Sequence, residues 1–338
     1  MDRILIDAFG GDNSPNEIII GAIDALKIKD GFKISLIGMQ DKIEEILSTL
    51  SYDSSRVEII PASEVITCEE KPVNAIMRKK DSTFNVGFKV LKEEESAKAF
   101  ISAGSTGAYL VGATLKLGRI EGVDRPALSP VLPTIVDGKR VILLDAGANA
   151  DCKSINLVQF AYMGVEYAKA LGVKEPKVAL LSNGTEEAKG NSLTIEVNEI
   201  LKNSNDINFV GNIEARDILS GEIDVVVADG FSGNVALKSL EGGIKAFTNL
   251  LKGEIYSSFK NKIAGLLLKK SFKKLYEKMD YNRQGGALLL GVNKAVIKIH
   301  GSSKRKAVTG AVLQASGLLD FDLSDSISKV LSKNNAVQ

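Results

Sequence analysis

Glycines and small polar residues follow five of the short aliphatic runs in this sequence, where the chain passes from a predicted strand into a predicted helix. A glycine lets the backbone approach a ligand closely, and a helix N-terminus presents free N–H groups and a positive dipole end. Loops of this kind are typical of anion sites, so five of them at one sheet edge argue for a site that handles phosphate. They span residues 7–13, 104–107, 145–149, 183–191 and 229–234.

Two side chains in these loops could act on a bound phosphate or on its reaction partner. Lys189 lies in a glycine-flanked loop that opens a predicted helix, where its ammonium could meet phosphate as a compact, mobile charge. A solvated surface lysine is the alternative. Asn234 follows a strand and a glycine loop, so its amide could donate to a substrate oxygen. The alternative for Asn234 is N-capping of the next helix, and the two roles are compatible.

The remaining composition excludes several kinds of chemistry. The single histidine, His300, rules out HExxH and any site with several histidine ligands, and no GxSxG motif supplies a serine nucleophile. Neither GxGxxG nor a Walker A motif is present, so a dinucleotide or a nucleoside triphosphate is not indicated. We therefore expect no cofactor and no metal site, although the aspartate-rich loops leave a loosely held Mg²⁺ open.

Charge and cysteine content bear on partners and location. A net charge of +1 gives no overall field for a nucleic acid, so we expect no nucleic-acid partner. The two cysteines lack CxxC spacing, which fits a reducing compartment. The apolar run at the N-terminus is too short for a signal peptide, and no stretch reaches the ~18 apolar residues of a membrane-spanning helix. We expect a cytoplasmic protein.

Aliphatic runs that alternate with helical periodicity predict an α/β fold with a mostly parallel sheet, covered on both faces. Residues 122–140, with three prolines, break the alternation and predict an antiparallel excursion or a crossing between subdomains. We therefore expect one catalytic unit over residues 1–330 with a soft subdivision near 122–140, and a frayed tail at 331–338. The predicted strands are 4–9, 33–38, 57–61, 99–104, 140–147, 177–182, 207–212 and 224–230.

One long helical region, from Asn234 to about Lys278, carries most of the positive charge. Residues 245–283 contain ten Lys or Arg and three Asp or Glu, and their apolar residues recur at i, i+4 spacing. This pattern predicts a basic amphipathic helical pair with an apolar tip. Three interpretations stay open: a dimer or core helix, peripheral membrane contact, and docking of an acidic carrier protein. The residues expected at the contact are Leu266, Leu267, Leu268, Lys269 and Lys270.

These motifs, in this order, resemble the bacterial phosphate acyltransferases of the PlsX family over about residues 3–320. The resemblance implies transfer of a fatty acyl group from acyl-[acyl carrier protein] to inorganic phosphate, which gives acyl phosphate for a glycerol-phosphate acyltransferase of phospholipid synthesis. It also implies a homodimer and a three-layer α/β/α sandwich, similar to phosphotransacetylases and isopropylmalate dehydrogenases. The most specific motifs lie at 7–12, 102–108, 125–128, 145–149, 184–191, 229–234 and 300–301.

The resemblance further suggests Lys189 and Asn234 as the catalytic pair and places His300 near the site, although a structural histidine is as good an interpretation. One departure is visible, because Ser182, Asn183 and Gly184 replace the usual Asn, aliphatic residue and Gly before the lysine loop. The residues expected to bind substrate are Gly104, Ser105, Thr106, Gly107, Asn149, Gly184, Thr185, Ser232, Gly233 and His300.

Other classes of protein remain as alternatives. A phosphotransacetylase-like enzyme that takes its acyl group from coenzyme A would need the same phosphate loops. A nucleotide-sugar or dinucleotide enzyme lacks its fingerprint. A binding module for membranes or carrier proteins would have no use for five polar glycine loops at one sheet edge.

Overall fold

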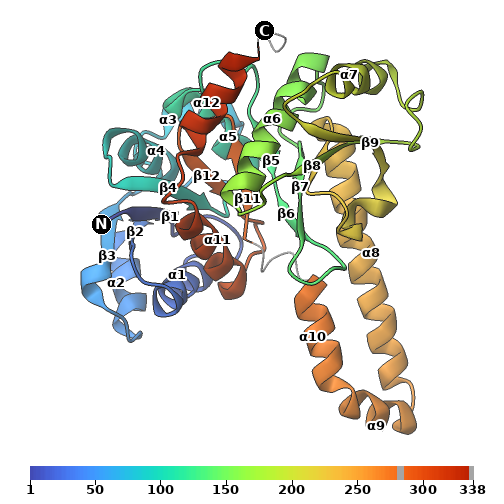
Figure 1. The fold of residues 1–338 in the computed structure, drawn as a ribbon. Coiled ribbons are helices and arrows are strands. Elements are labelled where there is room, and N and C mark those ends of the chain that lie inside the picture. Colours follow the sequence, from blue (N-terminus) through green and yellow to red (C-terminus); the bar gives the residue numbers. More distant parts are fainter. Residues whose placement is uncertain (280–284, 335–338) are drawn as a thin grey trace.

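The computed structural model describes residues 1–279 and 285–334, and these form two mostly parallel sheets with helices on their faces (Figure 1). Four neighbouring pairs of the first sheet are parallel, and its last two pairs are antiparallel. In sheet order its strands are β3 (Val57–Pro61), β2 (Lys33–Gly38), β1 (Arg3–Asp7), β4 (Ala97–Ser102), β12 (Ala295–Lys298), β11 (Ala287–Leu290) and β5 (Ala127–Ser129).

The second sheet is parallel except at one edge, where β6 pairs antiparallel with β7. The proline-rich segment 122–140 supplies β5 to the first sheet and β6 to the second, so it joins the two sheets. Whether it also divides the chain into subdomains stays a prediction. In sheet order the strands are β6 (Val131–Pro133), β7 (Arg140–Leu144), β10 (Val225–Val227), β8 (Lys177–Ser182) and β9 (Asn208–Glu214).

Helices cover both faces of the first sheet because successive side chains of its strands point to opposite faces. Ile4 and Ile6 pack with α1 and α11, whereas Leu5, between them, packs with α4 and α5. The expected three-layer sandwich is thereby confirmed. The helices of this half are α1 (Asn16–Ile28), α2 (Gln40–Ser48), α3 (Pro72–Arg78), α4 (Thr83–Glu93), α5 (Thr106–Leu117) and α11 (Arg305–Gly317).

The second sheet shows the same alternation. Ile142 and Leu144 belong to the core cluster that contains α6, while Val141 and Leu143 pack with α8. The α6 cluster extends through α12 to α1 and α11, so one core runs through both halves. The remaining helices of this half are α6 (Ser154–Ala170), α7 (Ser192–Lys202) and α12 (Leu323–Lys333), with 3₁₀ turns at Ser54–Arg56 and Ala215–Ser220.

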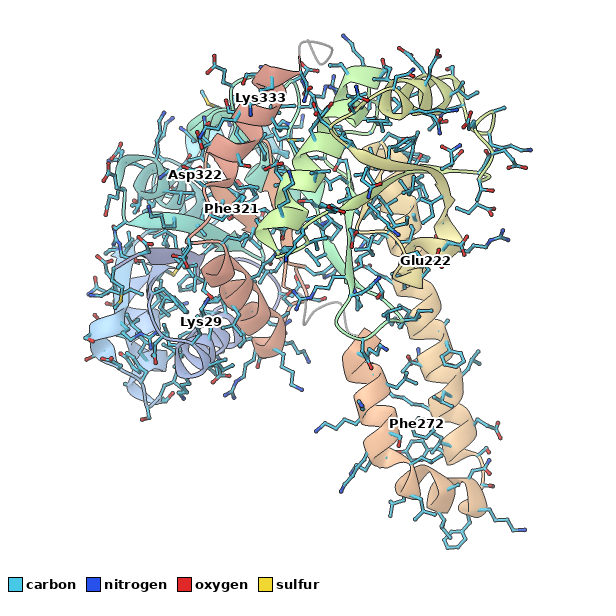
Figure 2. The ribbon with its side chains drawn as sticks, in the orientation of Figure 1. Lys29, Glu222, Phe272, Phe321, Asp322 and Lys333 are labelled. Carbon is cyan, nitrogen blue, oxygen red and sulfur yellow. The ribbon has the colours of Figure 1, made fainter. Side chains whose placement is uncertain are left out.

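The long helical region predicted from Asn234 to Lys278, with a helical pair and an apolar tip, consists of three helices. They are α8 (Gly230–Tyr256), α9 (Phe259–Leu267) and α10 (Lys269–Met279). We call the part of α8 after Ala236, together with α9 and α10, the helical arm. Ser258 N-caps α9 by accepting from the N–H of Asn261, and this cap ends α8. The arm projects from the body and folds back on itself (Figures 1 and 2).

The end of α10 returns to the body, because Lys278 Nζ lies 2.8 Å from Asp137 Oδ1 in the loop between β6 and β7. Residues 280–283 of the predicted basic segment and 335–338 of the predicted tail lie outside the described residues.

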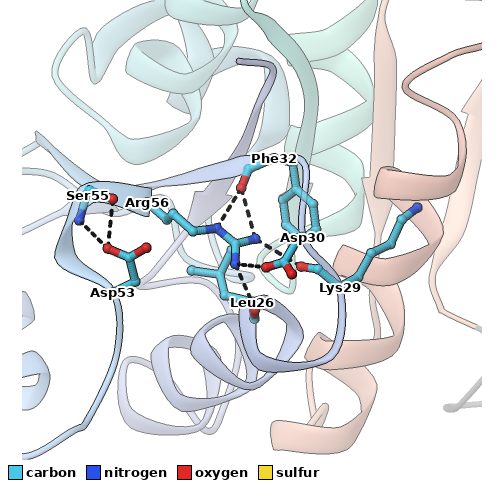
Figure 3. Close-up of polar contacts among 7 residues, drawn as sticks. All are labelled: Leu26, Lys29, Asp30, Phe32, Asp53, Ser55 and Arg56. Carbon is cyan, nitrogen blue, oxygen red and sulfur yellow. Dashed lines mark hydrogen bonds and ion pairs between the residues drawn. The ribbon is translucent and has the colours of Figure 1, made fainter.

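Arg56 ties three elements of the first half together (Figure 3). Its guanidinium donates to the backbone oxygens of Leu26, Lys29 and Phe32 and to Asp30 Oδ1, at distances of 2.7–3.2 Å. It also lies 5.5 Å from the ring centre of Phe32. The C-terminus of α1 leaves backbone carbonyls without helical partners, and Arg56 satisfies them while fixing the entry into β2.

Candidate active site

A cavity of about 380 Å³ lies where the carboxyl ends of the strands from both sheets meet. Parallel α/β sheets bind their ligands at this edge because glycine loops and helix N-termini gather there. The first sheet supplies Thr106, Lys298, His300 and Ser303 to the cavity wall, and the second supplies Gly147 and Asn234. The cavity therefore brings together three of the five loops predicted to bind an anion: those at 104–107, 145–149 and 229–234.

Asp145 organises the loop that follows β7. This fully buried carboxylate accepts hydrogen bonds from the N–H groups of Leu128, Gly147, Ala148 and Asn149, at 2.7–3.1 Å. Burial raises the pKa of Asp145, and these hydrogen bonds partly oppose the shift. The loop is therefore held from inside.

Asn149, expected to contact substrate, is bonded to the protein itself. Its Nδ2 donates to Pro126 O at 2.7 Å and to Asp145 Oδ2 at 2.9 Å. Asn149 is not among the residues that line the cavity. The structure thus gives it a part in shaping the loop, and its contact with substrate stays a prediction.

Asn234 lies on the first turns of α8 and lines the cavity next to Gly147. The N-cap of α8 is Asp229, whose carboxylate accepts from the N–H and the hydroxyl of Ser232 at 2.8 Å each. Asn234 is therefore not the cap, which removes one of its two interpretations. Within the described part of the chain its amide has no hydrogen-bond partner, so it is available to a ligand.

Gly233 allows the close approach of α8 to the Asp145 loop. A Cβ at Gly233 would lie 2.0 Å from the backbone oxygen of Asp145, where no side chain fits. Gly147 has a φ of +127°, a conformation that favours glycine. Both glycines are needed to bring Asn234 over the loop, while Ser232 serves the cap.

The loop after β4 is fixed by Ser102, which accepts from Gly104 N at 2.9 Å and donates to the buried Asp7 Oδ2 at 2.6 Å. Ser105 is buried, and Thr106 begins α5 and lines the cavity. Gly107 is exposed beside Pro72. Of the four residues expected to bind phosphate here, the cavity itself includes Thr106.

Lys189 lies in the loop after β8, beside β10 in the same sheet. Its side chain is exposed and covers the buried Gly184, and Thr185 is exposed nearby. None of these three residues lines the cavity that contains Asn234. The structure thus puts Lys189 on a loop adjacent to the α8 loop but outside the cavity, and its role stays a prediction.

Lys298 is the cavity residue that the sequence interpretation missed. It ends β12, it is 7% exposed, and burial lowers its pKa to about 8. Asp7, Asp12 and Cys68 face it and oppose that shift. The sequence does show Lys298 between two isoleucines in an otherwise apolar strand. This could have marked it as a functional residue, because a buried lysine without a role is rare.

His300 lines the cavity and is held by the turn that follows β12. The backbone N–H of Ser302 donates to His300 Nδ1 at 3.2 Å, and the Ser302 hydroxyl lies 2.8 Å from the same atom. Because a backbone N–H can only donate, Nδ1 is the acceptor and the neutral ring carries its proton on Nε2. His300 can therefore offer an N–H donor to a ligand.

The fold and the loops define an α/β protein with a cavity between two sheets, lined by three of the loops predicted to bind an anion. The structure resembles a phosphotransacetylase from Streptococcus pyogenes, with a TM-score of 0.60 and 18% identity over 94% of each chain. It also resembles a 4-hydroxythreonine-4-phosphate dehydrogenase from Klebsiella pneumoniae, with a TM-score of 0.54 and 11% identity over 94% of this chain and 99% of that one. At such low identity these likenesses bear on the fold alone.

Sequence comparison gives the family. The profile of the family described as "Fatty acid synthesis protein" matches residues 2–325. A phosphate acyltransferase from Acetivibrio thermocellus is 49% identical over 96% of this chain and 95% of its own. Another from Oceanobacillus iheyensis is 45% identical over 99% of each chain. The chain belongs to the phosphate acyltransferase (PlsX) family, and it is an acyltransferase, as the sequence motifs predicted.

Proposed function

We propose that the protein transfers a fatty acyl group from acyl-[acyl carrier protein] to inorganic phosphate and so forms acyl phosphate for phospholipid synthesis. The observation that carries the proposal is the amide of Asn234, which no other described residue engages, in a cavity that also holds Lys298 and the Nε2 donor of His300. This set of donors suits a reaction in which phosphate oxygens and a carbonyl oxygen carry the charge. The relatives named as phosphate acyltransferases support the same chemistry.

Phosphate is itself the nucleophile, so no covalent enzyme intermediate is required. An oxygen of hydrogen phosphate attacks the thioester carbonyl, the new C–O bond forms, and the C–S bond breaks. The phosphate proton leaves with the sulfur, so acyl phosphate and free thiol are the products. The amide of Asn234 donates to the carbonyl oxygen as it becomes an oxyanion, and positioning of the two reactants supplies the rest.

Lys189 has a separate part in the proposal. Its exposed ammonium has no protein partner among the described residues, and it lies on the loop beside the one that leads to Asn234. We assign it to phosphate capture together with the backbone N–H groups of loops 104–107 and 230–234. This assignment needs Lys189 to turn inward when phosphate is present.

The test is release of free thiol from acyl-[acyl carrier protein] and from acyl-CoA, measured side by side with and without phosphate. Phosphate-dependent release from the carrier-protein thioester, together with acyl phosphate trapped by hydroxylamine, is the expected result. Faster release from acyl-CoA would favour the phosphotransacetylase-like alternative. Thiol release at the same rate without phosphate would refute the proposal, because water would then be the acceptor.

The product implies a consumer, since an acyl phosphate is an activated mixed anhydride that hydrolyses in water. A glycerol-phosphate acyltransferase is the proposed downstream partner. Acyl glycerol phosphate should form when glycerol 3-phosphate and that enzyme are added to the reaction. We also propose a homodimer, which multi-angle light scattering would show as twice the mass of 36.1 kDa.

The helical arm is the proposed contact with a membrane. None of the described helices is long and apolar enough to cross a bilayer. At the turn between α9 and α10, however, Leu266 and Leu267 are 77% and 81% exposed, and Leu268 is 49% exposed. Lys269 and Lys270 follow them directly. An apolar tip flanked by lysines suits insertion between anionic headgroups, with about 1 kcal/mol of attraction for each lysine.

Flotation with vesicles tests this contact. The protein should float with vesicles that contain phosphatidylglycerol, and Leu267→Glu should abolish flotation. Ile28→Glu, which charges a side chain of 64% exposure far from the arm, should leave it unchanged. Unchanged flotation of Leu267→Glu would refute the membrane contact. A changed oligomeric state would point to a dimer contact instead, and weakened carrier-protein binding to a docking surface. We accordingly propose a cytoplasmic enzyme that associates peripherally with the membrane.

A further inference from the structure

The wall that the first sheet contributes to the cavity contains a buried cation. Lys298 is the last residue of β12 and pairs in register with Ser102 of β4, whose hydroxyl donates to Asp7. Its ammonium donates to the backbone oxygen of Ile299, the neighbour at the strand end. At 7% exposure it still lines the cavity, so a ligand there can meet its remaining N–H donors.

The charge of Lys298 has no ion-pair partner in the described part of the chain. Asp7 and Asp12 face the ammonium, but neither of these carboxylates lies within the 4.0 Å of a salt bridge. Burial of a lysine without a close counter-ion is costly, and a structural lysine is normally paired. A dianion bound in the cavity would supply the missing counter-charge.

Ser303 provides a second and independent observation. Its hydroxyl is buried, with 5% of the residue exposed, and has no hydrogen-bond partner among residues 1–279 and 285–334. It lines the same cavity as Lys298, from the turn that leads into α11. A buried hydroxyl without a partner destabilises the fold, because water no longer satisfies it. An oxygen acceptor in the cavity would remove that cost.

We propose that Lys298 Nζ and Ser303 Oγ bind oxygens of the attacking phosphate, on the wall of the cavity formed by the first sheet. The inference rests on the proposed function, because it takes inorganic phosphate as the acyl acceptor. Asn234, contributed by the second sheet, then faces the thioester carbonyl. The reacting phosphate oxygen and the carbonyl carbon meet between the two sheets, while Lys189 first captures phosphate from solvent and then turns inward with it.

Four variants test this assignment. Lys298→Met removes the charge, Lys298→Arg keeps it, and Ser303→Ala removes the hydroxyl without burying anything larger. Lys304→Met is the matched control, because Lys304 is exposed and does not line the cavity. The KM for phosphate and the KM for the acyl thioester are measured for each variant. In parallel, the rise of Tm with added inorganic phosphate is measured without any thioester.

Lys298→Met should raise the KM for phosphate by about 10- to 100-fold and abolish the rise of Tm with phosphate, because a charge-assisted hydrogen bond is lost. Ser303→Ala should raise the same KM by about 3- to 10-fold. The KM for the thioester should stay within about twofold in both, and Lys298→Arg should recover part of the phosphate response. Lys304→Met should behave like the wild type.

A wild-type KM for phosphate in Lys298→Met would overturn the inference and leave the proposed function intact. If Lys298→Met does not fold, the same result in Ser303→Ala decides the question. If the wild-type enzyme releases no thiol in a phosphate-dependent way, the proposed function fails. Phosphate would then still raise the Tm through Lys298 if the anion site is real. An equal rise of Tm in the wild type and in Lys298→Met would refute the anion site itself.

Discussion

Asn234→Ala should separate an effect on catalysis from an effect on folding, because of where the side chain lies. The side chain lines the cavity, has no hydrogen-bond partner among the described residues, and is not the N-cap of α8. Removal of the amide therefore leaves no buried group unsatisfied. Alanine also favours a helix over asparagine by roughly 0.5 kcal/mol, so the Tm should stay the same or rise slightly.

The effect on turnover follows from the number of donors removed. One preorganised donor to a developing oxyanion contributes about 2.7–4 kcal/mol, which corresponds to a loss of about 10²–10³ in kcat. Because this hydrogen bond strengthens only as the tetrahedral oxyanion forms, the KM for the thioester should change little. Initial rates of thiol release at saturating phosphate measure both quantities.

Asn249→Ala is the matched control, since Asn249 is an exposed asparagine of the same helix that lies away from the cavity. It should keep the wild-type kcat. A loss below about threefold for Asn234→Ala, at an unchanged Tm, would refute its role as the carbonyl donor. Parallel losses of kcat and Tm would show that the side chain supports the fold instead.

Three further predictions follow from the same geometry. Lys189→Ala should remove most activity at an unchanged Tm, and an active, phosphate-saturable variant would exclude its role in phosphate capture. Gly233→Ala should lower stability by about 1–3 kcal/mol, because its Cβ would lie 2.0 Å from Asp145 O. Gly242→Ala, on the same helix with nothing within 4 Å, should instead raise stability by up to about 1 kcal/mol, and denaturant titration compares the two. Finally, the pKa of Lys298 is about 8 in the folded protein and has its ordinary value of 10.5 in the unfolded chain. Between pH 8 and pH 10.5 the unfolded chain therefore holds a proton at Lys298 that the folded protein has lost, so the free energy of unfolding rises with pH in that range. The free energy of unfolding of the wild type relative to Lys298→Met should therefore rise by roughly 2–3 kcal/mol from about pH 7 to about pH 10, and a flat difference would contradict the burial of a charged lysine.

The parallel strands were the most predictable part of the fold. A run such as Ile4–Leu5–Ile6 is apolar on both faces because helices cover both, and that pattern is local in the sequence. The short antiparallel strands β5 and β6 were predicted only as a possible antiparallel excursion of residues 122–140, without strand bounds. Each has three residues, too few to show the alternation of apolar and polar side chains that marks a strand. They are strands because they pair with β11 and β7.

The helical region after β10 shows the opposite limit. Its apolar spacing predicted a helical pair with an apolar tip at residues 266–268, and the turn between α9 and α10 lies there. The turn at Ser257–Ser258, which separates α8 from α9, was not predicted. The return of α10 brings Lys278 into an ion pair with Asp137, a distant contact that no local pattern contains.

Among the residues of the cavity, the sequence by itself singled out the glycine loops and Asn234, because φ and close backbone approach depend on residue type. Their contact with substrate stays a prediction. Only the tertiary structure decided which loops share a cavity. It placed Thr106, Gly147 and Asn234 together, left Lys189 exposed outside, and brought in Lys298 and Ser303 from the far end of the chain. The physical reason is that the order of strands in the sheet differs from their order in the sequence. Because β12 lies beside β4, Lys298 is buried by residues far away in the sequence, and its sequence neighbours do not predict this.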